Sequence, residues 1–465
     1  MKGGSTLILF VVLLVVMVLV QYCSGYSKAP ADVITIDEDG IFTMSPSGSY
    51  PVFDYSDKYE RTYIGYYSSD HSIKLRYWEH ASGRLSDAVA LWQEWGYSAG
   101  GDSALLGDDH ANPAVIVLKY QKGANAIHNG KLLVAAAEHG SSKEGRGRLQ
   151  VRRSSKSEDI SAWEDPVQLR STNATYARLA ETFDGKIWLF CRLFSTASNS
   201  SATFYYWISE NAGDVWVSPE LLIDTDDGAT DAIYIAVAAN RASDELHFMF
   251  NRMVYNGFER GIHRYQDIYY VCYNVAQSTW HRIDGAVLTL PLTLSNVDIV
   301  YKTDSTKGKE DWTYLSNISV DKNNTPYLLS CTDQDRGAAI RGGICEVLRH
   351  SYDTKELRWI TERVCDTARF HYANLAALAP CNCDVAYACV PDEYGIGQLQ
   401  KWQKEEGRWT KVLDITKGSS GHNARPYVTT SCDSTRIFWS YITEYKGSPY
   451  TDWESKILGF TDFLK

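Results

Sequence analysis

The stretch Ser209-Glu210-Asn211-Ala212-Gly213-Asp214-Val215-Trp216 carries the local pattern that best indicates the fold of this chain. It follows Phe204-Tyr205-Tyr206-Trp207-Ile208, an aromatic run of the kind that favours a β-strand. Polar residues and a glycine then fill a short segment typical of a turn. Together the two segments predict a hairpin, with the glycine in the turn and Trp216 packed between strands.

Strand-like runs of this kind recur along the chain at an average spacing of roughly 60 residues. Each is a short apolar or alternating segment, bounded by Gly, Asn, Asp or Ser, and most precede a second alternating strand such as Leu149-Gln150-Val151-Arg152-Arg153. The seven runs are Thr62–Tyr67, Lys131–Ala137, Lys186–Cys191, Glu245–Phe250, Pro326–Cys331, Asp384–Cys389 and Thr435–Tyr441. Repeated units of several short strands predict an all-β protein, a seven-bladed β-propeller with four antiparallel strands per blade.

The length of the chain agrees with a propeller. A mature chain of about 440 residues exceeds the roughly 250–300 that one hydrophobic core supports, but each blade of a propeller packs only on its neighbours. We therefore expect one propeller domain over residues 26–465. Ser209–Trp216, and a degenerate copy at Ser157–Trp163, resemble the Asp-box hairpins of neuraminidase-type propellers, and we interpret both as turns rather than catalytic sites.

Residues 1–25 predict a secretory signal peptide. Lys2 precedes an apolar run from Thr6 to Val20, and Cys23-Ser24-Gly25 supplies small residues for cleavage after Gly25. The apolar run of about 15 residues is shorter than the roughly 20 that span a bilayer, although an uncleaved anchor is the alternative. We expect a secreted protein with no membrane contact after cleavage. Four glycosylation sequons fit that compartment, at Asn173, Asn199, Asn317 and Asn323.

Ten cysteines include Cys23 of the signal peptide, so an odd number remains and at least one thiol must be free. In an oxidising compartment the others are candidates for disulfides. A zinc site formed by His281, Cys331 and Cys345 is an alternative, but its spacing matches no compact zinc motif. We predict neither a metal site nor a cofactor.

The formal net charge of −11 argues against nucleic acid as a partner, because that binding depends on clustered Lys and Arg. An anionic polymer would therefore need a locally basic cleft.

Polar residues occur at or near strand-like runs in successive predicted blades. Strand ends and loops of a propeller converge on one face, so such residues can meet around a central crevice. Arg192 directly follows the apolar run Ile187–Cys191, where a guanidinium needs an anionic partner. Asn112 flanks His110 and could fix the tautomer of its imidazole. The full set is His110, Asn112, His139, Tyr176, Arg192 and Tyr234.

Four stretches of the chain resemble a known family. They are Asp108–Leu118, Lys131–Gly140, Val151–Ser154 and Tyr176–Arg192. They are similar to BNR-repeat proteins that include the seven-bladed ulvan lyases of polysaccharide lyase family 25. The resemblance is good between residues 60 and 290 and weak in the last blades, and the loop from Tyr120 to Gly130 is a departure from the family pattern.

The resemblance implies a catalytic pair, His110 and Tyr176, that exchanges protons with the substrate, while Arg192, His139 and Tyr234 hold the uronate. The chemistry suits these groups: a neutral imidazole can accept the C5 proton, a phenol can protonate the leaving oxygen, and a guanidinium can neutralise the carboxylate. We therefore predict a secreted, monomeric lyase that cleaves a uronate-containing, ulvan-like anionic polysaccharide by β-elimination.

Two other classes remain open at this point. A sialidase-like glycoside hydrolase would share the architecture and would need acidic residues such as Asp226, Asp227 and Asp231. A non-catalytic glycan-binding propeller would use the same aromatic-rich blades without chemistry.

Overall fold

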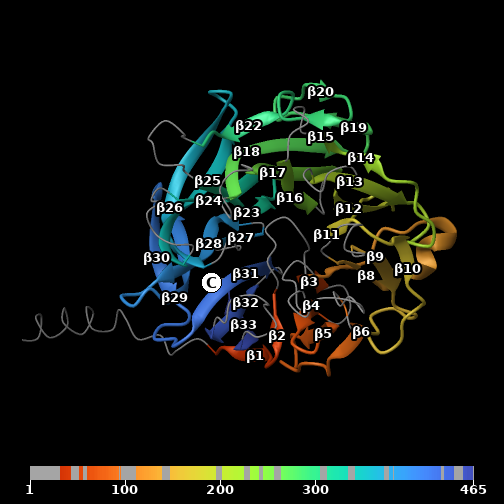
Figure 1. Cartoon of the computed structure of the whole chain (residues 1–465), viewed down its shortest axis with the longest axis horizontal. Coiled ribbons are helices and arrows are strands. Elements are labelled where there is room, and N and C mark those ends of the chain that lie inside the picture. The colour runs from red at the N-terminus through yellow and green to blue at the C-terminus, as the bar shows by residue number, and fades with distance from the viewer. Residues whose placement is uncertain are drawn as a thin grey trace, which may run out of the picture.

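The computed structural model describes residues 32–42, 52–55, 60–93, 95, 112–138, 147–194, 202–224, 231–239, 244–255, 263–303, 312–333, 341–370, 376–380, 382–430, 434–444 and 454–463. Within these ranges every regular element is a strand except the 3-10 helix η2 (Gly123–His128). Figure 1 shows the sheets arranged in a ring, which the chain follows from red to blue. The described residues contain no helix that is long and apolar enough to cross a membrane.

The N-terminal half of the ring is formed by antiparallel groups of four strands. The first group is β3 (Val52–Tyr55), β4 (Arg61–Ser68), β5 (Ile73–Glu79) and β6 (Val89–Trp92), with β2 (Gly40–Ile41) also paired to β4. The second is β7 (Ala114–Val117), β8 (Leu132–Ala137), β9 (Leu149–Arg153) and β10 (Val167–Arg170). The third is β11 (Ala174–Glu181), β12 (Ile187–Phe194), β13 (Ala202–Ser209) and β14 (Glu220–Leu221).

A fourth group continues the third through one parallel bridge between Ala202 and Ala232. It is β16 (Asp231–Ala239), β17 (Glu245–Tyr255), β18 (His263–Asn274) and β19 (Thr279–His281), with β20 (Val287–Leu288) on β19 and β22 (Asp298–Tyr301) on β18. A separate parallel pair joins β15 (Ile223–Asp224) to β21 (Leu292–Thr293). Because β13 runs parallel to both β11 and β16, the latter two strands begin at the same end of the sheet.

Three further groups complete the ring. They are β23 (Trp312–Val320), β24 (Pro326–Asp333), β25 (Arg341–Asp353) and β26 (Arg358–Phe370); then β27 (Ala376–Ala379), β28 (Asn382–Pro391), β29 (Gly397–Glu405) and β30 (Arg408–Asp414); then β31 (His422–Thr430), β32 (Ser434–Glu444), β33 (Glu454–Phe463) and β1 (Ile34–Asp37).

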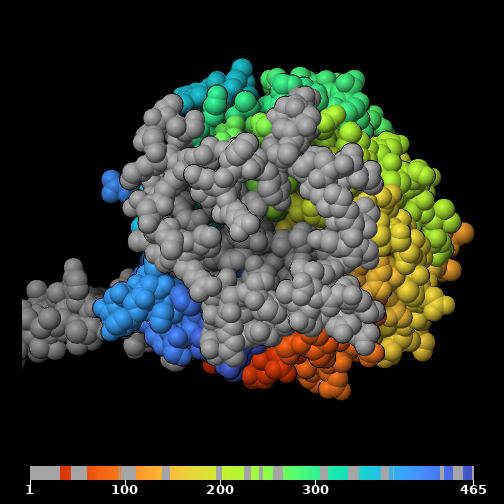
Figure 2. Space-filling view, in the orientation of Figure 1, coloured from red at the N-terminus to blue at the C-terminus, as the bar shows by residue number. Residues whose placement is uncertain are grey.

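The last group closes the ring, since its outer strand comes from the start of the chain. Ile34 of β1 lies opposite Gly459 of β33. A Cβ on Gly459 would lie 3.1 Å from Ile36 and 3.2 Å from Phe438, so glycine permits this close approach. In the space-filling view the coloured residues follow the same order around the rim of the disc (Figure 2).

All seven predicted strand cores overlap strands of the structure, which confirms the all-β prediction. Each lies in the second strand of its group, namely β4, β8, β12, β17, β24, β28 and β32. A second strand is covered on both faces by the neighbouring sheets, so its sequence becomes a continuous apolar run. In β8, for example, all six residues are buried.

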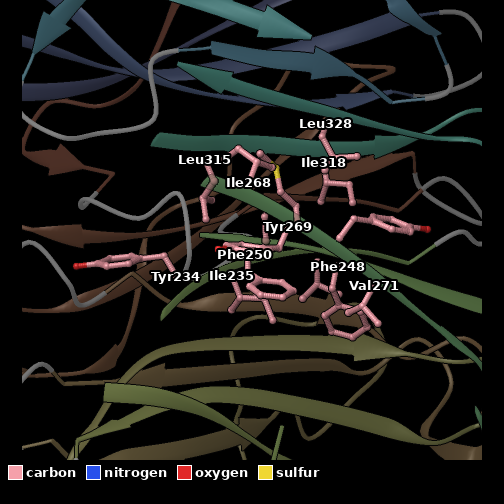
Figure 3. Packing of buried hydrophobic residues seen from close by; sticks show 14 of the residues in the cluster. Tyr234, Ile235, Phe248, Phe250, Ile268, Tyr269, Val271, Leu315, Ile318 and Leu328 are labelled. Atoms are coloured by element: carbon pink, nitrogen blue, oxygen red, sulfur yellow. The ribbon is translucent and has the colours of Figure 1, made fainter. Parts of the chain in front are cut away.

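The hydrophobic core lies between adjacent sheets. Figure 3 shows the part around β16, β17 and β18, where Ile235, Phe250 and Ile268 gather in one cluster. Tyr234, next to Ile235 on β16, belongs to the same buried cluster, and its ring extends to one side of the other labelled residues (Figure 3). Successive residues of β16 therefore pack against different neighbours, and Tyr234 packs against the rings of Tyr176 and Tyr265.

The hairpin predicted at Ser209–Trp216 is a turn, as expected. Val215 N donates to Asn211 Oδ1 at 2.8 Å, and the Trp216 indole donates to Gly213 O at 3.0 Å. Gly213 has a φ of +91°, which favours glycine. The degenerate copy uses the same device, because the Trp163 indole donates to Ile160 O at 2.8 Å.

Candidate active site

Tyr176 lies in an irregular part of β11. The register between β11 and β12 shifts between Thr175 and Arg178, so Tyr176 sits in a bulge. Its φ is +59°, in the left-handed region that non-glycine residues rarely enter. Bulges of this kind redirect a side chain and are frequent beside active sites. The local backbone thus turns the phenol of Tyr176 out of the regular alternation of the strand.

Arg192 lies opposite Thr175, near the end of β12. Its guanidinium carbon is 4.6 Å from the centroid of the Tyr176 ring and 4.7 Å from that of Tyr234. Phe194 adds a third ring at 5.2 Å. Only 2% of Arg192 is exposed, so the cation is desolvated and held against aromatic faces, a contact worth about 0.5–2 kcal/mol. β12 continues beyond the apolar run Ile187–Cys191 to Phe194, so Arg192 lies within the strand rather than after it.

Tyr234 comes from β16, in the next four-strand group. Its ring centroid is 5.7 Å from that of Tyr176, and the two planes are tilted by 50°. Since β11 and β16 begin at the same end of the sheet, the two phenols converge from neighbouring groups. The structure therefore brings together three of the six predicted residues: Tyr176, Arg192 and Tyr234.

Asn112 lies just before β7 and is buried. Its Nδ2 donates to the Tyr427 hydroxyl of β31 at 3.4 Å, which ties the second group to the last one. The predicted roles of His110 and His139 fall on residues outside those that the structure describes. β7 begins four residues after His110, and β8 ends two residues before His139. Because β7 and β8 are antiparallel, these two strand termini lie at the same end of their sheet.

Two tyrosines that the sequence did not single out extend the aromatic cluster. The Tyr265 hydroxyl donates to the Tyr234 hydroxyl at 3.5 Å, and the two ring centroids are 5.3 Å apart. Tyr314 follows at 4.7 Å from Tyr265. A row of phenols therefore runs from β11 through β16 and β18 to β23. Tyrosine is abundant in this chain, so composition alone carried no signal for these two positions.

Cys191 precedes Arg192 and is not a candidate nucleophile. Its thiol donates to Thr175 O at 3.1 Å, and burial raises its pKa to about 12. The thiolate, which is the reactive form, is therefore scarce near neutral pH. Among the described cysteines, buried free thiols occur at Cys191, Cys272, Cys331, Cys365 and Cys389.

The alternative zinc site named from the sequence is wrong in two of its three residues. Cys331 and Cys345 lie on β24 and β25, in a different group of strands from His281 on β19. Among the described residues, the one group of three metal-ligating side chains with close ligand atoms is Glu245, Cys272 and His281.

Comparison with known families explains the resemblance of the motifs. A model described as "BNR repeat-containing family member" matches residues 61–367, a segment that contains all six predicted site residues. The chain belongs to this BNR repeat-containing family.

Two curated relatives match more than half of the chain. Ulvan Lyase-PL25 of Pseudoalteromonas sp. (strain PLSV) is 24% identical over 317 residues, covering 64% of this chain and 59% of the relative. Ulvan lyase of Alteromonas sp. (strain LOR) is 24% identical over 300 residues, covering 60% and 58%. This BNR-family chain thus spans less than two thirds of the length of either relative.

Solved structures resemble the whole fold. Two structures described as polysaccharide lyase PL25 ulvan lyase, one of them bound to -[GlcA(1-4)Rha3S]-, each superpose with a TM-score of 0.70 at 15% identity. Each superposition covers 91% of this chain and 94% of the other. At this identity the likeness establishes a shared fold.

Proposed function

We propose that this protein is a secreted polysaccharide lyase that cleaves a uronate-containing polysaccharide by β-elimination. The observation that carries the proposal is the Arg192 guanidinium between the rings of Tyr176 and Tyr234. The similarity of the chain to two curated ulvan lyases supports it.

Arg192 is the group that would bind the uronate carboxylate. Removal of the C5 proton is difficult because it leaves negative charge on the carbon beside the carboxylate. A guanidinium can neutralise the carboxylate through two parallel hydrogen bonds and stabilise that charge. Since Arg192 is almost fully buried, this interaction would form in desolvated surroundings, where it is stronger than in bulk water.

Tyr176 and His110 are the proposed proton-transfer pair. His110 would take the C5 proton, and the electrons of that C–H bond would form the C4=C5 double bond as the C4–O4 bond breaks. Tyr176 would donate its phenolic proton to the departing O4. The two products are a new chain end with a hydroxyl and a conjugated unsaturated uronate, and both side chains return to their starting states once the proton passes from His110 to Tyr176 through solvent.

His139, Tyr234 and Asn112 are proposed to hold the substrate around this pair. Tyr234 is supported by its contact with Arg192 and by its packing against Tyr176. For His110 and His139, the support is that the start of β7 and the end of β8, the strand ends nearest to them in sequence, lie at the same end of the sheet.

We further propose that the architecture is a seven-bladed propeller formed by residues 26–465 and acting as a monomer. Seven antiparallel groups, each with at least four strands, support the blade number, as does the pairing of β1 with β33, which would close the ring. Residues 1–25 are the proposed signal peptide.

The proposed substrate is an ulvan-like polymer in which a uronate neighbours a sulfated rhamnose. This rests on the oligosaccharide held by the structural neighbour. The test is to incubate the secreted protein with ulvan and with other uronate polymers, and to follow ultraviolet absorbance and reducing ends together. A lyase produces both signals. Reducing ends without absorbance would indicate a glycoside hydrolase, and retention of the polymer with neither signal would indicate a binding protein; either result overturns the proposal.

A further inference from the structure

Side chains suited to metal binding meet on one face of β17, β18 and β19. Cys272 of β18 lies directly opposite His281 of β19 in the strand register. Glu245 begins β17 and lies opposite Asn274, two residues from Cys272 and thus on the same face. The ligand atoms of Glu245, Cys272 and His281 all lie within 4.8 Å of one another. Three adjacent strands therefore each contribute one possible ligand.

The spacing of these atoms suits a tetrahedral ion. Zinc binds oxygen, nitrogen and sulfur at about 2.0–2.3 Å, which places neighbouring ligand atoms of a tetrahedron about 3.3–3.8 Å apart. Glu245 Oε1 and His281 Nε2 are 3.5 Å apart. The carboxylate and the imidazole thus already stand at the separation that one shared ion requires.

The hydrogen bonds around the cluster orient its members. His281 Nδ1 is 2.9 Å from Arg282 O, so that nitrogen donates to the carbonyl and Nε2 faces the Glu245 carboxylate. A backbone carbonyl that holds the far nitrogen of a histidine is the usual support of a metal-binding imidazole. The carboxylate of Glu245 accepts hydrogen bonds from the side-chain amides of Asn274 and Asn324. These amides fix its position at the edge of the sheet.

His247 lies beside the cluster as a supporting residue. Its Nδ1 is 2.7 Å from the Tyr270 hydroxyl, and its Nε2 is 3.0 Å from Asn324 Oδ1. With both ring nitrogens engaged, His247 supports Asn324, which in turn contacts Glu245. His247 therefore has no nitrogen left for an ion, and the protein would supply three ligands.

We propose that Glu245, Cys272 and His281 form a binding site for a zinc-class divalent cation. A thiolate and an imidazole select a borderline-soft ion such as zinc over magnesium or calcium, whose ligands are oxygens. When the ion binds, the Cys272 thiol releases its proton to solvent, and the resulting thiolate and the Glu245 carboxylate together carry two negative charges that neutralise the ion. Glu245 and His281 are only partly buried, so water takes the fourth position.

The site is separate from the proposed catalytic and substrate-binding residues. Tyr234 lies opposite Asn251, six residues along β17 from Glu245, which corresponds to roughly 20 Å of extended strand. The ion therefore acts as a clamp within this sheet. It ties the three-residue strand β19 to the longer strands β17 and β18.

The first test is metal content. The full secreted chain is dialysed against zinc and then against buffer, and bound zinc is measured by mass spectrometry for wild type, Cys272→Ser, His281→Asn and the control Cys331→Ser. Cys331 is also a buried free thiol but lies on β24. We expect one zinc per chain in wild type and in the control, and at least a tenfold weaker affinity in the two site variants. Zinc-free wild type, or equal binding by Cys272→Ser, overturns the proposal.

A second readout needs no variant and so does not depend on their folding. Cobalt(II) loaded into the wild-type protein should give the ultraviolet thiolate-to-metal charge-transfer band. Added zinc should displace the cobalt and remove the band. Chelation should also lower the thermal unfolding midpoint of wild type, because an ion that binds only the folded state stabilises it. Absence of the cobalt–thiolate band excludes Cys272 as a ligand. Neither measurement depends on whether the protein is a lyase.

Discussion

The Arg192 guanidinium lies 4.6 Å from the ring of Tyr176, although the two residues are sixteen positions apart and belong to different strands. The antiparallel pairing of β11 and β12 sets Arg192 opposite Thr175, and the bulge in β11 then turns Tyr176 toward it. A proposed anion-binding group and a proposed proton donor are thus held together by one strand pair. The arrangement leads to separate predictions for each residue.

Replacement of Arg192 by lysine should impair turnover nearly as severely as replacement by alanine. Lysine keeps the charge but lacks the planar fork that binds a carboxylate through two hydrogen bonds and stacks on the rings of Tyr176 and Tyr234. Loss of such a contact in the transition state typically lowers the rate by about 10²–10³. Initial rates of unsaturated uronate formation would measure this, with Arg84→Lys on the surface as control. Near-normal turnover by Arg192→Lys would remove Arg192 from the site.

Tyr176→Phe and His110→Ala should each abolish elimination while the fold and most of the glycan affinity remain. The phenylalanine variant keeps the ring against Arg192 and removes only the hydroxyl that donates the proton. The double variant should be little slower than either single one, because the two groups act as a unit. Tyr205→Phe, on β13, is the matched control. Full-rate elimination by Tyr176→Phe would exclude it as the acid.

Sequence patterns predicted the strands well, because strand cores are set by local composition and burial. The seven apolar runs became the second strands of seven groups, and the turn at Ser209–Trp216 formed as expected. Tyr176, Arg192 and Tyr234, which the resemblance of motifs linked, contact each other in the fold, while their roles stay predictions.

Features that depend on long-range pairing left no local signal. The pairing of β1 with β33 joins strands from near the start and the end of the chain, and no periodicity in the sequence predicts it. The cluster of Glu245, Cys272 and His281 arises from strand register, so its sequence spacing matches no compact motif. The left-handed backbone at Tyr176 also has no recognisable sequence pattern, because the bulge is defined by the pairing of β11 with β12.

If the chain is secreted, the predicted sequons should differ in their glycosylation. Asn323 is exposed in a turn, where its backbone N–H donates to Asp321 at 2.8 Å. Asn173 is only 2% exposed and has a φ of +69°, so the folded chain has no room for a glycan there. Asn323→Gln should therefore remove a glycosidase-sensitive mass, whereas Asn173→Gln should not. Glycopeptide mapping that finds Asn173 occupied in folded protein would contradict the burial of this residue.

The stability of the protein should fall in acid partly through His350. This fully buried imidazole bridges Ser330 of β24 at 2.8 Å and Thr361 of β26 at 2.9 Å. Burial disfavours the charged ring and lowers the pKa of His350 to about 3. In the unfolded chain the pKa of histidine is about 6.5.

Between these two pKa values the unfolded chain binds a proton that the folded protein does not, so the free energy of unfolding decreases as the pH falls. The contribution of His350 to the free energy of unfolding is complete above about pH 6.5. Below that pH it decreases by about 1.4 kcal/mol per pH unit, so about 2 kcal/mol is lost at pH 5. His350→Gln keeps a neutral polar group between the two hydroxyls and cannot titrate, so it should lack this component. Urea unfolding of both proteins at pH 7 and pH 5 measures the difference, and an equal loss of stability in the two would show that His350 is not its source.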